Sequence, residues 1–76
     1  MIDFARIVLD LRGHFGTVAQ VARKMGYGNP DMLRHLERGE ISDPRFSVGM
    51  DLCDLYRKVI ADELPVVGGG QQRRLL

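Results

Sequence analysis

The chain has 76 residues, enough for one small domain and no more. Hydrophobic residues make up 45% of it, so we expect a folded core, while 11 basic and 10 acidic side chains leave a net charge of only +1. A charge this near to zero does not by itself indicate a nucleic-acid partner, so that function must rest on motifs and on where the charges lie. The single cysteine, Cys53, excludes an internal disulfide and a cysteine-based zinc site.

The N-terminal segment lacks the features of a targeting sequence. Asp3 follows Met1 almost at once, and the apolar run Ile7–Leu9 is too short to span a bilayer. We therefore expect a cytoplasmic protein with no membrane partner, in which Cys53 is a reduced, buried apolar residue.

The first predicted helix runs from Asp3 to Phe15. Asp3 is a suitable N-cap, and Gly16 is a suitable terminator. One apolar stripe recurs at three- and four-residue spacing and consists of Phe4, Ile7, Val8, Leu11 and Phe15.

Two short helices are predicted next. Thr17 followed three residues later by Gln20 has the capping-box pattern, and Gly26 ends this helix. Its buried stripe consists of Val18, Val21, Ala22 and Met25. Asn29 as N-cap and Pro30 at the first helical position then predict a helix over Pro30–Arg38. Two short helices joined by a tight turn with glycine predict a helix-turn-helix spanning about Thr17 to Arg38.

A longer last helix is predicted from Pro44 or Phe46 to Leu64. Gly49 is expected to weaken it and to divide it in two, and Pro65 ends it. Its broad apolar face, which exceeds what one thin core needs to cover, is a candidate dimer surface and consists of Val48, Leu52, Leu55, Tyr56, Val59 and Ile60. The chain then divides into a domain over 1–64 and a flexible tail over 65–76.

The third predicted helix carries the candidate functional residues. Met32, Leu33 and Leu36 fall on one side of a helical wheel. The other side combines cations with an acid and consists of Asp31, Arg34, His35 and Arg38. These side chains suit base contacts in a DNA major groove, since Arg bonds guanine bidentately and Asp accepts from cytosine. The alternative is a solvated polar face without a ligand.

Several of these features resemble the helix-turn-helix of phage Cro and repressor proteins, an XRE-like family. Ala22 and Gly26 are four residues apart, as in that family, and the run 36–40 (Leu-Glu-Arg-Gly-Glu) followed by Pro44 is similar to its W-E-R-G-(K)-x-x-P ending. The resemblance covers about 8–64. It implies an all-α, four- to five-helix, lambda-repressor-like domain that binds double-stranded operator DNA as a homodimer, in a bacterial cytoplasm and on the nucleoid when bound.

The chain departs from the family pattern at three positions. Gly28 makes the turn one residue longer, which changes the residue that first meets the bases. Val18 stands where the family often has a DNA-contacting Gln, and Leu36 stands where it often has Trp. Tyr27, in the same turn as Gly28, is expected to be an apolar lid rather than a DNA contact.

Phosphate contacts are predicted around the same motif. Thr17 and Asn29 lie at helix N-termini, where backbone N–H groups point toward anions. Arg23 and Lys24 lie off the buried stripe, and Arg45 follows the loop after the third helix. For each cation the alternative is an ordinary solvated side chain.

No enzyme is predicted. The two histidines, His14 and His35, form no metal-binding motif, and no phosphate-binding glycine loop or nucleophile–base pair is visible. We therefore expect no catalytic residue, no metal and no cofactor.

Three functions remain open. The first is a transcriptional regulator of phage or prophage type that binds an operator as a homodimer. The second is a protein-interaction factor on the same fold, for instance one that binds RNA polymerase; it is favoured by the near-neutral charge and by the acidic residues Asp51, Asp54, Asp62 and Glu63. The third is a regulatory component of a toxin–antitoxin or anti-defence system, which would also bind DNA.

Overall fold

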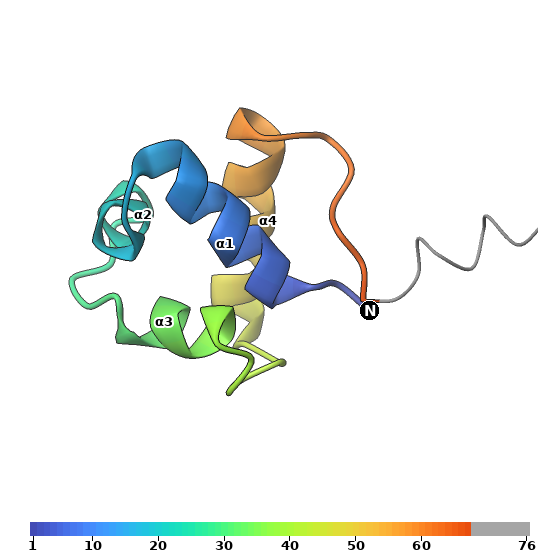
Figure 1. Ribbon diagram of the computed structural model, residues 1–76, viewed down its shortest axis with the longest axis horizontal. Coiled ribbons are helices and arrows are strands. Elements are labelled where there is room, and N and C mark those ends of the chain that lie inside the picture. Colours follow the sequence, from blue (N-terminus) through green and yellow to red (C-terminus); the bar gives the residue numbers. More distant parts are fainter. Residues whose placement is uncertain (68–76) are drawn as a thin grey trace, which may run out of the picture.

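The computed structural model describes residues 1–67, and all regular secondary structure in them is helical. The helices, in chain order, are α1 (Phe4–Phe15), α2 (Val18–Lys24), α3 (Asp31–Glu37) and α4 (Phe46–Val59). α1 lies in the middle, in contact with the other three helices, and α2 also packs on α3 (Figure 1). The predicted all-α class is confirmed, with four helices in the described part of the chain.

Local capping interactions set the helix ends where the sequence predicts them. The Asp3 carboxylate accepts a hydrogen bond from a backbone N–H in the first turn of α1, and Thr17 Oγ1 accepts one from the Gln20 N–H at 3.1 Å. Gly16 and Gly26 follow α1 and α2 with φ of +105° and +82°, which side-chain-bearing residues rarely adopt. The first two helices therefore end for the predicted reason.

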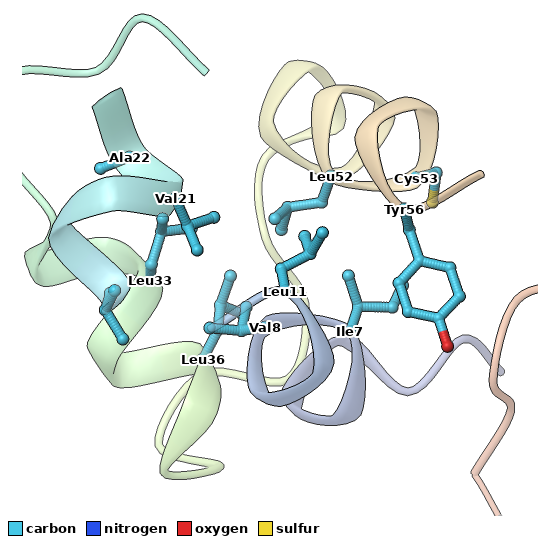
Figure 2. Close-up of a cluster of buried hydrophobic side chains, with 11 residues drawn as sticks. Ile7, Val8, Leu11, Val21, Ala22, Leu33, Leu36, Leu52, Cys53 and Tyr56 are labelled. Atoms are coloured by element: carbon cyan, nitrogen blue, oxygen red, sulfur yellow. The ribbon is translucent and has the colours of Figure 1, made fainter. Parts of the chain in front are cut away.

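One hydrophobic core joins all four helices (Figure 2). Its buried members are Ile7, Val8 and Leu11 of α1, Val18, Val21 and Ala22 of α2, Leu33 and Leu36 of α3, and Leu52, Cys53 and Tyr56 of α4. Burial of these side chains is the main favourable term for a chain of this size. The burial of Cys53 is confirmed, and the predicted stripes of the first three helices face this core, although four of their members are only partly buried: Phe4, Phe15, Met25 and Met32.

The last helix differs from its prediction in two respects: it is continuous at Gly49, and it ends earlier than expected. α4 ends at Val59 and is not broken at Gly49. A Cβ at Gly49 would lie 3.3 Å from the Phe4 Cζ atom, so the glycine lets α1 approach α4 closely. The predicted extension to Leu64 is wrong because the chain leaves the helix after Ile60.

Most of the predicted dimer face of the last helix packs against the domain's own core. Leu52 and Tyr56 are buried in the core, and Val48, Leu55 and Val59 are half-buried against it. Of the six predicted residues only Ile60 is exposed, at 37%. The exposed apolar side chains of α4 are instead Phe46 and Met50, at the other end of the helix.

The segment after α4 returns to the N-terminus (Figure 1). The Asp3 N–H donates to the Pro65 carbonyl at 2.9 Å, the Val67 N–H donates to the Met1 carbonyl at 2.8 Å, and Ile2 forms an isolated antiparallel bridge with Val66. The packed part of the chain thus continues past residue 64, where the sequence places the start of the tail. The rest of the predicted tail, 68–76, lies outside the described residues.

Candidate nucleic-acid interface

α3 presents one buried and one exposed face. Leu33 and Leu36 are fully buried, so they hold α3 against the core. The side chains on the opposite side are exposed, and we call them the α3 polar face: Asp31, Arg34, His35 and Arg38. The structure therefore brings the four predicted base-contacting residues onto one solvent-facing surface, and the core fixes its orientation.

The start of α3 differs by one residue from the prediction. The helix begins at Asp31, and Pro30 is the residue before it. Asn29 Oδ1 accepts a hydrogen bond from the Asp31 N–H at 2.9 Å, but the N-cap residue is Pro30, so the prediction of Asn29 as N-cap is wrong by one residue. The Asn29 side-chain oxygen is engaged in the turn, as is the oxygen of Thr17 at the start of α2.

Carboxylates lie next to both arginines and the histidine of the α3 polar face. Arg34 Nη1 is 3.3 Å from Asp31 Oδ1. His35 Nδ1 is 2.5 Å from Glu40 Oε1, and Arg38 Nη1 is 3.7 Å from Glu40 Oε2. The hydrogen bond from His35 lowers the pKa of the Glu40 carboxyl, which therefore stays ionised at neutral pH. The face is close to electrically balanced, and its exposed ion pairs are weak enough to exchange partners.

Sequence reasoning did not assign Glu40 to the site. It lies beyond the end of α3, and Gly39, with φ of +80°, turns the chain so that the Glu40 N–H donates to the His35 carbonyl at 3.0 Å. The signal available in the sequence was the glycine at the end of the helix, which permits this return of the chain.

A depression of about 600 Å³ with a mixed polar and apolar lining lies between the end of α1, the start of α2 and one side of α3. Thr17, Arg34 and Arg38 line it together, so one predicted phosphate contact and two predicted base contacts share a surface. Arg12 and Glu37 also line it and form an ion pair at 2.8 Å. This pair was not predicted from the sequence. The Glu37 side chain is only 17% exposed, and this pair ties α3 to α1.

The other predicted phosphate contacts lie apart from this depression. Arg23 and Lys24 form the exposed end of α2, and Lys24 Nζ stands 5.9 Å from the centre of the Phe15 ring. Arg45 precedes α4 and lines a different, apolar pocket. Within residues 1–67, none of these three cations has a carboxylate within 4.0 Å. They are therefore available to an external anion.

Tyr27 holds the segment between α2 and α3 in place. Its side chain is half-buried, and its hydroxyl donates to Asp51 Oδ2 of α4 at 2.8 Å. Burial, together with the hydrogen bond to Asp51, raises the pKa of Tyr27 to about 12. The predicted role of Tyr27 as a lid over the core agrees with this position.

Comparisons of the chain with known protein families, with curated protein sequences and with solved structures found no significant match. In the described part of the chain no three His, Cys, Asp or Glu side chains are grouped as metal ligands would be. None of the described helices has the length and apolar character needed to cross a membrane.

Proposed function

We propose that the protein is a sequence-specific DNA-binding transcriptional regulator, of the phage repressor or Cro type, that reads the major groove with α3. In this proposal α2 and α3 are the two helices of a helix-turn-helix. The observation that carries it is the α3 polar face, which exposes Arg34, His35 and Arg38 on a helix whose opposite side is locked into the core.

The connection between α2 and α3 supports this reading. Ala22 is buried in the core, and its carbonyl accepts from the Tyr27 N–H at 2.8 Å. Gly26 adopts a positive φ in the turn. A small buried residue and a left-handed glycine allow two short helices to pack closely at an angle, which is what a helix-turn-helix requires.

The ion pairs of the α3 polar face are compatible with base reading and affect its selectivity. Arg34 and Arg38 must leave Asp31 and Glu40 before they contact guanine, so non-specific attraction to DNA is low. Arg23, Lys24 and Arg45 supply phosphate contacts that need no such exchange. Affinity for random DNA then comes from few cations, and a correct sequence adds the base contacts.

Binding selection from a random duplex library tests the proposal, followed by titration of the selected duplex at several salt concentrations. Arg34→Ala and Arg38→Ala should each reduce specific affinity by about 5- to 150-fold, which corresponds to about 1–3 kcal/mol for a bidentate base contact. Arg23→Ala should weaken all sequences alike and reduce the salt slope by about one. Arg57→Ala is the matched control, because Arg57 is similarly exposed but lies on α4.

A protein-interaction factor, for example one that binds RNA polymerase, is the second candidate. The balanced charge of the α3 polar face favours it, because a DNA-reading surface is usually strongly positive. If the full chain selects no duplex above random, co-sedimentation with RNA polymerase distinguishes this function from DNA binding.

A further inference from the structure

The N-terminal end of α4 exposes two large apolar side chains on one face. Phe46 is 83% exposed, and Met50, one helical turn later, is 47% exposed. Side chains at this spacing are neighbours on a helix surface. A nearly fully exposed phenyl ring is unfavourable in a free monomer, and neither ring nor thioether has a role in the proposed DNA contacts.

An apolar pocket of about 340 Å³ lies beside these side chains. Its lining includes Phe4, Gly49 and Cys53 as well as Phe46 and Met50 themselves. A cavity of about 150 Å³ is enough to hold a benzene ring, so this pocket can accept a phenyl side chain. A protruding ring and a pocket that fits such a ring therefore occur side by side on one surface.

We propose that this surface, the Phe46 patch (Phe4, Phe46, Gly49, Met50 and Cys53), binds the same surface of a second copy of the chain, so that each Phe46 ring packs into the partner's pocket. A two-fold interface requires one patch that is complementary to itself, and adjacent ring and pocket meet this condition. The charged residues at the pocket are one acid, Asp43, and one base, Arg45. Two copies thus meet without net charge repulsion at the pocket.

The area of the patch predicts a weak dimer. A phenylalanine side chain buries roughly 150–250 Å² when covered, so the two Phe46 rings bury about 300–500 Å² between them. Stable interfaces bury at least about 1,200 Å², so the free protein should associate only at high concentration. The inference rests on the proposed function at one point: Phe46 directly follows Arg45, a proposed phosphate contact, so DNA can hold two copies side by side and complete the dimer.

Sedimentation of the full chain without DNA, from about 10 µM to 1 mM, tests the interface separately from DNA binding. We expect the average mass to rise from one copy toward two across this range. Phe46→Ala should remain monomeric at the highest concentration with an unchanged helical spectrum, because the ring is exposed in one copy. Leu9→Ala is the control, since Leu9 is also exposed, at 39%, but lies on α1 away from the patch.

A fluorescent variant separates a second copy from other occupants of the pocket. The chain contains no tryptophan, so Phe46→Trp reports on this position alone. Its emission should shift to shorter wavelength as concentration rises, and Cys53 should react more slowly with a thiol reagent over the same range. A wild-type chain that stays monomeric at 1 mM, a Phe46→Ala variant that still dimerises, or an emission of the Phe46→Trp variant that is already shifted at high dilution would each overturn the proposal. The last result would mean that the same copy fills its own pocket.

Discussion

Replacement of Leu36 by alanine tests whether the core holds α3 in its orientation. Leu36 is fully buried and belongs to the same core as Val8 of α1 (Figure 2). Leucine-to-alanine changes at such positions cost about 2–5 kcal/mol, depending on how far the surrounding residues close the cavity. A folded part of 67 residues has a total free energy of unfolding of about 3–10 kcal/mol, so the loss is comparable with the whole stability.

The assay is thermal and urea unfolding of the full chain, followed by circular dichroism. A loss of about 3 kcal/mol should lower the melting temperature by about 12–24 °C in a domain of this size. Leu9→Ala is the matched control and should change stability by less than about 0.5 kcal/mol, since Leu9 lies at the surface. A Leu36→Ala melting curve that coincides with wild type would refute the burial of Leu36 and with it the assignment of the α3 polar face.

Three further outcomes are expected. Glu40→Gln removes the carboxylate that contacts both His35 and Arg38, so affinity for random duplex DNA at low salt should rise several-fold, while specific affinity changes less; fluorescence anisotropy measures both. Gly26→Ala should cost about 1–2 kcal/mol because its φ is +82°, whereas Gly28→Ala, which has free space and no positive φ, should be neutral; equal unfolding midpoints would contradict this. The free energy of unfolding should fall as pH rises from about 10 to 12, because the pKa of Tyr27 is about 12 in the folded state and about 10 in the unfolded state. The melting temperature of Tyr27→Phe should decline less than that of wild type over this pH range.

Sequence determined the features that depend on neighbours in the chain. The starts of α1 and α2 follow from Asp3 and Thr17, whose side chains bond backbone N–H groups only three residues away. The ends of these helices follow from glycines in backbone conformations that other residues avoid. Periodicity predicted the buried stripes, because a helix has a fixed angle per residue and only one side of it faces the core.

Tertiary structure decided the features that depend on residues far apart in the chain. Gly49 was expected to weaken the last helix, yet the helix is continuous there because the glycine packs against Phe4, far earlier in the chain. The end of α4 lies before the predicted position, and the segment after it pairs by backbone hydrogen bonds with Met1 and Asp3. No local pattern contains these partners.

The candidate site divides in the same way. Helical spacing alone predicts that Arg34, His35 and Arg38 share one exposed face, because residues three and four apart lie on the same side of a helix. Asp31 lies three residues before Arg34 on the same face, but the carboxylate beside His35 and Arg38 was decided by the turn at Gly39, which returns Glu40 to the end of α3. The charge of a surface is the sum of all side chains that the fold brings to it, and that sum becomes known only when the path of the chain is known.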